Sequence, residues 1–290
     1  LTDRKWDVLI SEPSNPWMSG MASLFTREFF EEARDRLTPR GIHCQWLHSY
    51  NMSNEDLRTV IRTFRTAFPF AALWALNEND FLLLGSPSEI EVREDVVRAN
   101  FELVKSDLRG VLIQDLYSVL SLFMIADGDL DRFAGDGPLN TDDFPILEFR
   151  SPRFIYANTT DENLAAILAV DRQVPLPPLV AEFMANPTAE NHRKKGDMLL
   201  FAGSYESAAR EVQVAVELDF RDQEGWSGLI RAARGRAVEP ATEFISEMVE
   251  RHPEPAVLMA AAEHYQLHSD TARASELLDM VLETDSENLA

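Results

Sequence analysis

A loop near the start of the chain carries the side chains best suited to chemistry. It reads Glu12-Pro13-Ser14-Asn15-Pro16-Trp17 and follows directly on an apolar run. Glu12 can accept a proton from an attacking nucleophile or hold an ammonium group. Asn15 offers a carbonyl oxygen to an amine, and Trp17 offers an apolar wall or a face for a cation. The prolines stiffen the loop and hold these side chains in position. On its own, the pattern is equally well explained by a tight turn with an exposed glutamate.

The segments on both sides of this loop predict an α/β sheet. Residues 6–11 and 42–47 are short apolar runs typical of strands, whereas residues 24–37 and 53–68 place apolar side chains at helical spacing. The turn at residues 38–41 is expected to end the first of these helices. Alternating strands and helices indicate a parallel sheet, and in such sheets ligands bind at the carboxyl ends of the strands. The loop is therefore expected at a ligand-binding edge.

Later segments extend this sheet and then become helical. Residues 71–76 and 81–84, joined by a turn at residues 77–80, predict a hairpin that makes the sheet mixed. We expect residues 88–135 to be helical, with residues 112–126 as the firmest element of that stretch.

From residue 188 onward the pattern is one of paired helices. Ala208, Ala241 and Ala274 are evenly spaced along the chain. Their period is close to that of the tetratricopeptide repeat, which this part resembles, with small residues where helices cross. The small and aromatic positions of the first unit are occupied by Gly196, Gly203, Tyr205, Ala208 and Ala215. We expect residues 188–290 to stack as helix pairs with a concave surface for a protein partner, an unrelated array of helical hairpins being the alternative.

Composition limits the partners and the compartment. The 290 residues carry 27 basic and 49 acidic side chains, a net charge of -22. Such a surface repels nucleic acid and attracts cationic substrates such as amines, although solubility alone is the simpler explanation. Cys44 is the only cysteine, which excludes an internal disulfide and fits a cytoplasmic location. The most apolar stretch, residues 111–126, is too short to span a bilayer.

The order of motifs resembles the polyamine aminopropyltransferases, the spermidine synthase family and its spermidine synthase-like relatives. The motifs are Asp7-Val8-Leu9-Ile10, the loop at residues 12–16, Leu24-Phe25-Thr26-Arg27-Glu28-Phe29-Phe30, Leu37-Thr38-Pro39-Arg40-Gly41-Ile42 and Gln45. Asn140-Thr141-Asp142-Asp143 with Leu147-Glu148-Phe149 is similar to a late segment of the group. The resemblance covers residues 1–156 and implies the C-terminal half of a Rossmann-like, methyltransferase-type sheet. A linker at residues 157–187 is expected before the repeats.

The family implies a mechanism for these residues. Its first loop aspartate removes a proton from an acceptor amine, which then attacks the aminopropyl group of decarboxylated S-adenosylmethionine. Glu12 stands at the position of this catalytic base, and Asn15 at the position of a second aspartate that holds the amine. Ser14, Trp17 and Gln45 are expected to complete the substrate site, and no metal ligand is assigned. The resemblance thus implies aminopropyl transfer to a small amine in polyamine biosynthesis.

The chain departs from the family in this same loop. Glu12 moves the carboxylate outward by about an ångström, and misplacement on that scale can cost about a hundredfold in rate. Asn15 lacks the negative charge that would pair with a cationic amine, and residues 74–80 lack the family's longer tyrosine-bearing segment. Gly-x-Gly-x-x-Gly occurs nowhere in the chain. We expect the cofactor loop and the ribose-binding acid upstream of Asp7, in a longer protein that is either free in the cytoplasm or tethered by upstream membrane helices.

Other interpretations stay open. Ser14-Asn15-Pro16-Trp17 is also similar to the Asn-Pro-Pro-Tyr/Trp loop of amino-group methyltransferases, which use S-adenosylmethionine. In a third interpretation the α/β part is catalytically idle and the repeats form an interaction module; a homodimer is a further assembly to test. His264 and His268 are spaced for a metal pair, but no third ligand completes the site. His43 and His48 lie near Gln45 and are expected to be packed or solvated rather than to line the site.

Overall fold

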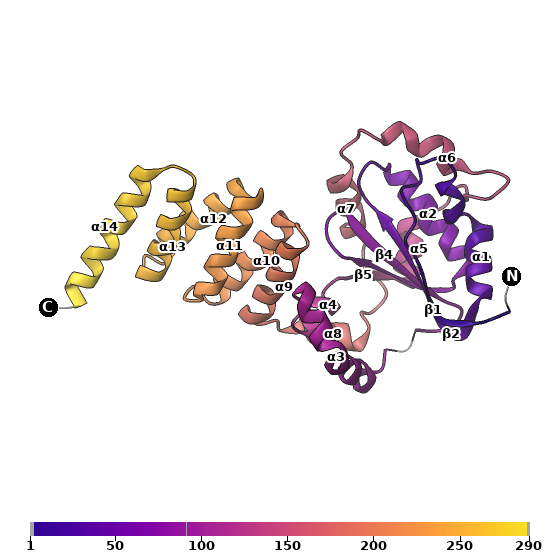
Figure 1. The fold of residues 1–290 in the computed structure, drawn as a ribbon, viewed down its shortest axis with the longest axis horizontal. Helices are drawn as coiled ribbons and strands as arrows, with labels where there is room; N and C mark the ends of the chain where they lie inside the picture. The colour runs from indigo at the N-terminus through magenta and orange to yellow at the C-terminus, as the bar shows by residue number, and fades with distance from the viewer. Residues whose placement is uncertain (1–2, 91, 289–290) are drawn as a thin grey trace. The chain divides into compact units, whose positions relative to one another are not determined.

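The computed structural model describes residues 3–90 and 92–288, which form two compact units (Figure 1). The α/β unit combines Leu1–Glu94 with Leu122–Val180, and the helical unit combines Asp95–Ser121 with Ala181–Ala290. An α/β part followed by a helical part is therefore confirmed. The segment Asp95–Ser121 lies within the α/β part of the sequence but packs in the helical unit.

A five-stranded mixed sheet forms the centre of the α/β unit. Its strands are β1 (Trp6–Ser11), β2 (Leu37–His48), β3 (Phe70–Ala75), β4 (Asp80–Ser86) and β5 (Phe123–Ala126). Their spatial order is β1-β2-β4-β3-β5. β1 and β2 run parallel, and each of the other neighbouring pairs is antiparallel. The expected parallel pair and the expected hairpin are both present, and the hairpin makes the sheet mixed.

β2 begins earlier than predicted. The turn expected at residues 38–41 is part of this strand, and helix α1 (Arg27–Asp35) ends before it. The pairing with β1 accommodates these residues through a register shift between Trp6 and Val8. A Cβ on Gly41 would lie 2.8 Å from the carbonyl oxygen of Trp6, so the close approach of the two strands requires glycine there.

The stretch at residues 112–126 is not the single firm helix that the sequence predicts. The preceding helix, α3 (Glu94–Leu108), runs into the 3-10 turn η2 (Arg109–Val111) and stops at Leu112. Leu112 has a φ of 57°, a left-handed conformation that a helix cannot continue through.

Two short elements replace that helix. Asp115 caps α4 (Leu116–Leu120) by accepting a hydrogen bond from the Ser118 amide at 2.8 Å. The apolar residues after α4 form β5, in which the alternate side chains Phe123 and Ile125 are buried. A short apolar run does not by itself distinguish a buried strand from a buried helix, and here pairing with β3 decides in favour of the strand.

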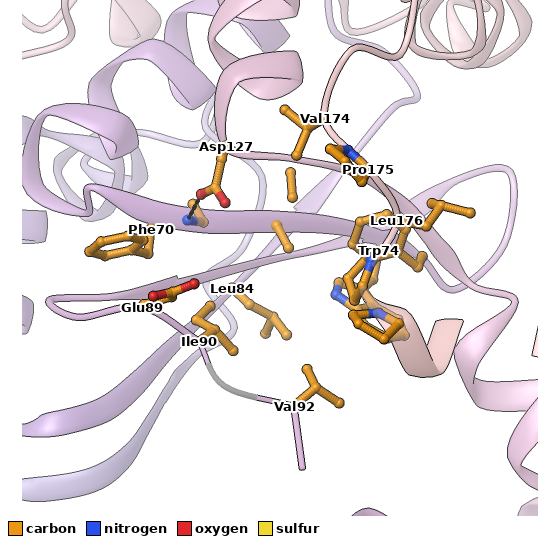
Figure 2. A pocket seen from close by; sticks show the side chains of 16 residues that line it. Phe70, Trp74, Leu84, Glu89, Ile90, Val92, Asp127, Val174, Pro175 and Leu176 are labelled. Carbon is orange, nitrogen blue, oxygen red and sulfur yellow. Dashed lines mark hydrogen bonds between the residues drawn. The ribbon is translucent and has the colours of Figure 1, made fainter. Parts of the chain in front are cut away.

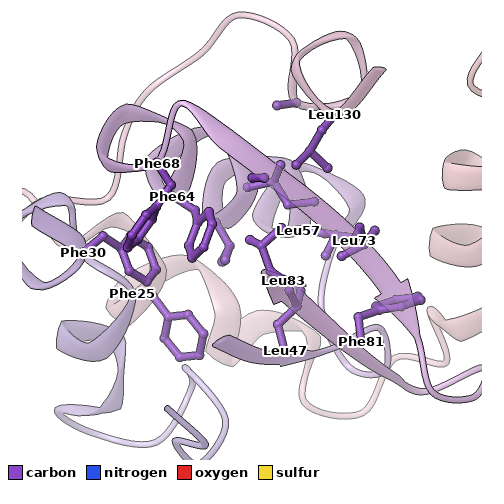
Figure 3. Close-up of a cluster of buried hydrophobic side chains, with 14 of the residues drawn as sticks. Phe25, Phe30, Leu47, Leu57, Phe64, Phe68, Leu73, Phe81, Leu83 and Leu130 are labelled. Carbon is purple, nitrogen blue, oxygen red and sulfur yellow. The ribbon is translucent and has the colours of Figure 1, made fainter. Parts of the chain in front are cut away.

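The main core of the α/β unit lies between one face of the sheet and the helices α1, α2 (Asn54–Ala67) and α5 (Asp127–Ala134). Thr26 and Ser53 cap α1 and α2 through their side-chain oxygens. The buried side chains of this core include Phe25, Phe30, Leu47, Leu57, Phe64, Phe68, Leu73, Phe81, Leu83 and Leu130 (Figure 3). Burying each contributes about 1.5–3 kcal/mol, which makes this layer a rigid base for the loops at the sheet edge.

The remaining elements of the α/β part are short. They are η1 (Met21–Phe25), α6 (Ile146–Arg150), η3 (Ser151–Phe154) and α7 (Thr160–Leu168). Residues 157–187, expected to be a linker, contain α7 and α8 (Pro178–Ala185). The fully buried Asn140 joins several of these segments. Its side-chain Nδ2 donates to the Ala22 carbonyl at 3.0 Å, and its Oδ1 accepts from the backbone N–H of Leu147 at 3.3 Å.

Three successive helix pairs make up most of the helical unit. They are α9 (Ala189–Phe201) with α10 (Tyr205–Leu218), α11 (Gln223–Gly235) with α12 (Val238–Arg251), and α13 (Pro255–Leu267) with α14 (Thr271–Asn288). The first helices of the three pairs begin at nearly equal intervals along the chain. A Cβ on Gly196 would overlap Val212 Cγ2, so α9 and α10 approach too closely for a larger residue. The helical part therefore repeats one helix pair at a nearly constant period.

A partly buried polar group attaches α4 to the first helix pair. His192 Nδ1 lies 2.7 Å from Glu211 Oε2, and Lys195 Nζ lies 2.6 Å from the other oxygen of Glu211. Asn191 donates to Asp115 at 3.0 Å, and the Tyr117 ring packs beside His192. These contacts explain why the segment that contains α4 belongs to the helical unit. Within the described parts of the chain, none of the helices combines the length and apolar character needed to cross a bilayer.

Candidate functional site

The carboxyl ends of β1 and β2 meet at one edge of the sheet. The two strands are parallel, and Ser11 at the end of β1 is paired with Gln45 near the end of β2. The loop at residues 12–17 and the residues after Trp46 are therefore neighbours, although a helix and most of a strand separate them in sequence. This is the edge at which open α/β sheets bind ligands.

Glu12 and Ser14 are exposed at this edge. Within residues 3–90 and 92–288, Glu12 takes part in no hydrogen bond or ion pair. Its neighbours Pro13 and Pro16 are buried and anchor the loop. The carboxylate is thus held on a fixed backbone with its oxygens open to a ligand.

Asn15 and Trp17 contact residues from the end of β2. The Tyr50 hydroxyl donates to Asn15 Oδ1 at 3.3 Å. The Trp17 ring packs edge-on against His48, with 4.8 Å between the ring centroids, and lies 6.2 Å from the Tyr50 ring. We call Trp17, Trp46, His48 and Tyr50 the aromatic cluster. Trp17, Trp46 and Tyr50 are half-buried, so these three members present aromatic surface near the Asn15 amide.

His48 is the most unusual member of the aromatic cluster. It is completely buried, and neither ring nitrogen has a hydrogen-bond partner in the described structure. It stacks on Trp46 at 5.4 Å and packs against Tyr50 at 4.5 Å. Burial lowers the pKa of His48 to about 3, so the ring is neutral at pH 7. It carries one unpaired donor and one unpaired acceptor, which is costly in a protein interior.

Asp80 places a negative charge next to this cluster. It is paired with His48 across β2 and β4, and its Oδ1 accepts a hydrogen bond from Trp46 Nε1 at 3.2 Å. Burial raises the pKa of Tyr50, and the charge of Asp80 raises it further, while the hydrogen bond to Asn15 opposes both effects. The arrangement of aromatic faces beside a carboxylate suits a cationic group.

The chain after β2 is held by buried polar side chains of α7 and of the residue before it. Asn163 donates to the carbonyl oxygens of Ser49 at 2.7 Å and Met52 at 2.8 Å. Thr159 donates to Ser49 and accepts from the Met52 amide. Asn51 lies between these anchors with a left-handed φ of 50°. The turn that carries Tyr50 is therefore fixed from both sides.

Gln45 lies on the opposite face of β2 from the aromatic cluster. It is fully buried, its Nε2 donates to the Trp46 carbonyl at 3.1 Å, and its Oε1 lies 3.4 Å from His43 Nε2. His43 is itself stacked on Phe68, and burial lowers its pKa to about 4. Strand alternation separates these side chains from His48, and the described structure shows no hydrogen bond between Gln45 and the loop at residues 12–17.

Of the residues assigned from the sequence, Asn15 and Trp17 lie together at the aromatic cluster. Glu12 and Ser14 lie at its exposed rim, and Gln45 lies on the opposite face of β2. Sequence reasoning did not assign Trp46, Tyr50 or Asp80. Alternation along β2 could have grouped Trp46 with His48, but Asp80 is brought in by the register of β4. No group of three or more potential metal ligands was found among the described residues.

Comparison of the chain with protein-family models and with curated proteins finds no match.

Proposed function

We propose that this chain belongs to a spermidine synthase-like transferase that moves an aminopropyl group from decarboxylated S-adenosylmethionine to an amine. The observation that carries the proposal is the aromatic cluster beside Asn15 and Asp80, at the carboxyl ends of the parallel strands. The parallel pair followed by an antiparallel hairpin agrees with the half-sheet that the motifs imply. The helix pairs, with their nearly constant period, support tetratricopeptide-like repeats that bind a protein partner.

In this proposal each side chain has a task. Glu12 accepts the proton that the attacking amine must lose, because an amine is nucleophilic only when it is neutral. Asn15 accepts a hydrogen bond from the same amine and is oriented by Tyr50. Asp80 supplies the negative charge that the loop lacks at Asn15, and attracts the distal ammonium group of a diamine. Trp17 and His48 exclude water from one side.

The nucleoside donor is not assigned to residues of this chain. The donor supplies an alkyl group activated by a sulfonium: the amine forms the new C–N bond as the C–S bond breaks, and the sulfur leaves as a neutral thioether. The family binds the donor with a Gly-rich loop that this sequence does not contain. The residues described above fit the amine half of the reaction. The proposal places the protein in the cytoplasm, with its single cysteine in reduced form.

A Glu12→Gln variant tests the proposal. In the intact protein, we expect it to abolish aminopropyl transfer to a diamine, with a loss of at least about a hundredfold, while the fold is retained because Glu12 is exposed. Glu162→Gln is the matched control, because it removes the same charge from another exposed position. Turnover like that of the unmodified protein in the Glu12 variant would remove Glu12 from the mechanism.

Amino-group methyl transfer is the second candidate. The observation that favours it is the Asn15 amide held beside the Trp17 ring, in a loop similar to that of amino-group methyltransferases. Calorimetry on the intact protein separates the two functions. Tighter binding of S-adenosylmethionine than of its decarboxylated form favours methyl transfer. Binding of neither nucleoside favours an idle α/β unit whose helical repeats act as the interaction module.

A further inference from the structure

The sheet of the α/β unit has a cavity on the face opposite the main core. Its volume is about 390 Å³, and it is lined by residues of β3, β4 and β5, by Glu89, Ile90 and Val92 after β4, and by residues 174–178 (Figure 2). Phe70, Trp74, Leu84 and Phe123 contribute apolar surface from the strands. A cavity of this size accommodates a small organic molecule. It lies on the sheet face and is separate from the strand-end site described above.

The outer wall of this cavity is fixed to the unit. Residues 174–178 contain three prolines, which restrict the backbone. At the start of this wall, the almost fully buried Asp129 accepts hydrogen bonds from the amides of Gln173 at 2.9 Å and Val174 at 3.3 Å. The segment expected to be a linker is thus a structural wall of the cavity.

The two ends of the cavity differ in chemistry. Glu89 and Asp127 lie near Phe70 at one end, whereas Trp74 lies with Pro175 and Leu176 at the other (Figure 2). Phe70 and Trp74 are four residues apart on β3, a separation of about 13 Å along a strand. Asp127 Oδ1 accepts from the Ala71 amide at 3.0 Å and lies 3.7 Å from Arg65 Nη1, whereas Glu89 is exposed with no partner among the described residues.

The indole N–H of Trp74 is buried and has no hydrogen-bond partner in the described structure. An unpaired buried donor costs about 1–3 kcal/mol relative to a paired one. A ligand with an acceptor therefore gains by pairing with this N–H once the Trp74 ring, which lines the cavity, shifts to admit it. Among the described residues that line the cavity there is no lysine, arginine or histidine. An anionic ligand would meet the carboxylates of Glu89 and Asp127. The one cation described beside them, Arg65, is shared between Asp127 and Asp131, so the net charge at this end of the cavity is negative.

We propose that this cavity binds a small apolar amine that places its ammonium group near Glu89 and Asp127 and an oxygen acceptor on the indole N–H of Trp74. The apolar centre of the ligand lies against Ala72, Leu84 and Phe123. The site is a second amine-binding site on the unit, and it does not require that the protein be a transferase.

The probe for this site is 4-methoxyphenethylamine, which has an ammonium group at one end, an aromatic ring, and an ether oxygen at the other end. We expect binding in about the millimolar range, as suits a ligand of this size. In nitrogen-15 spectra of the intact protein, the indole resonance of Trp74 should shift during the titration, and Trp74→Phe identifies that resonance among the five tryptophans. Phenethylamine, which lacks the ether oxygen, should bind about fivefold more weakly.

Three variants make the test specific. In Trp74→Phe, followed through backbone amides of β3, the two amines should bind equally, because the donor is absent. Glu89→Gln should weaken both amines about threefold, with a smaller effect at high salt, whereas Glu162→Gln, an exposed control outside the cavity, should change neither. Ala72→Leu should fill the cavity and prevent binding.

The proposal is overturned if the Trp74 indole resonance does not move, if 4-ethylanisole or 3-(4-methoxyphenyl)propanoate binds as well as the amine, or if the preference for the ether oxygen survives in Trp74→Phe. Because these measurements follow binding at the sheet face alone, they stand or fall independently of the Glu12→Gln experiment.

Discussion

The two units differ in what they bury. The interior of the α/β unit holds many polar side chains, including His43, Gln45, His48, Asp56, Asn140 and Asn163, whereas the described buried polar residues of the helical unit are Ser118, Ser204 and His264. The helical unit instead buries small and aliphatic residues such as Ala209, Ala232, Ala241 and Ala261. Polar groups are costly to bury unless they are paired.

This difference reflects how each unit specifies its shape. In the α/β unit, Asn140 and Asn163 satisfy backbone carbonyls of irregular segments and so fix loops that no regular hydrogen-bond ladder would hold. In the helical unit the backbone is satisfied within helices, and close packing at Gly196 and at the alanines sets the arrangement. Positioned loops can hold reacting groups, whereas stacked helices provide an extended surface. The following experiments test this contrast.

Acidification should have the largest effect and should separate the units. Burial lowers the pKa of His43 to about 4 and of His48 to about 3 in the α/β unit, and burial together with His268 lowers that of His264 to about 4 in the helical unit. In the unfolded chain these rings bind protons near pH 6.5. The unfolded state therefore gains protons first, and stability is lost as the pH falls from about 6.5 toward the folded pKa.

Between pH 7 and pH 5 each such ring should lower the free energy of unfolding by about 2 kcal/mol. Histidine titration therefore lowers it by about 4 kcal/mol in the α/β unit and by about 2 kcal/mol in the helical unit. Hydrogen exchange, read separately for peptides of each unit, measures the slope of the free energy of unfolding against pH for that unit. In His48→Phe the slope of the α/β unit should fall by about one proton, and that unit should gain stability at pH 7. If His48→Phe leaves the slope of the α/β unit unchanged, the conclusion that His48 is buried in its neutral form is wrong.

Asn163→Ala should have the next largest effect. It removes the donors to Ser49 and Met52. The Ser49 carbonyl keeps the Thr159 hydroxyl as a donor, but the Met52 carbonyl loses the Asn163 amide, and we expect the free energy of unfolding of the α/β unit to fall by about 2–3 kcal/mol. Because the same residue fixes the turn at Tyr50, exchange should rise most in residues 49–53. Asn158→Ala, at an exposed position five residues earlier, is the control. Equal stabilities of the two variants would show that the turn does not depend on this anchor.

Gly196→Ala is the corresponding change in the helical unit and should cost less. The added methyl would overlap Cγ2 of the fully buried Val212. Overpacking costs about 1–3 kcal/mol, and the better helix propensity of alanine returns about 0.5–1 kcal/mol, so the net loss is about 1–2 kcal/mol. Gly110→Ala, where nothing lies within 4 Å of the new atom, should have little effect. Thermal unfolding of both variants decides whether the α9–α10 crossing is as close as described.

The same contrast explains what could be predicted from the sequence. The hairpin β3–β4 and helix α2 were predicted because local signals, a polar turn and the Ser53 cap, agree with their tertiary surroundings. The prediction for residues 112–126 was wrong because an apolar run fits a strand or a helix equally well, and pairing with β3 made the choice. The period of the helical part was readable because each pair contacts its neighbours, so the pattern stays local.

The candidate site was only half predictable for a related reason. Glu12, Asn15 and Trp17 follow a strand directly, and their place at the sheet edge depends on that strand alone. Tyr50 and Asp80 join them through the register of β1, β2 and β4, although Tyr50 and Asn15 are far apart in sequence. A single sequence does not encode that register in any short motif.

Tyr50→Phe should have the smallest effect of these changes and is the sharpest test of the site. It removes the hydroxyl that donates to Asn15 but keeps the ring that packs against His48 and Trp17. Stability should fall by about 1 kcal/mol or less. Under the proposed function, kcat/KM for the amine should fall about fivefold, because the Asn15 amide loses its orientation.

A double-mutant cycle with Asn15→Ala should give a coupling free energy of about 1 kcal/mol between Tyr50 and Asn15. Tyr156→Phe, which changes a fully solvated hydroxyl, should show no coupling to Asn15→Ala. If the effects of the Tyr50 and Asn15 variants on kcat/KM are additive, the hydrogen bond does not orient the Asn15 amide. The loops of the α/β unit would then be fixed in place by α7 but not arranged to bind an amine.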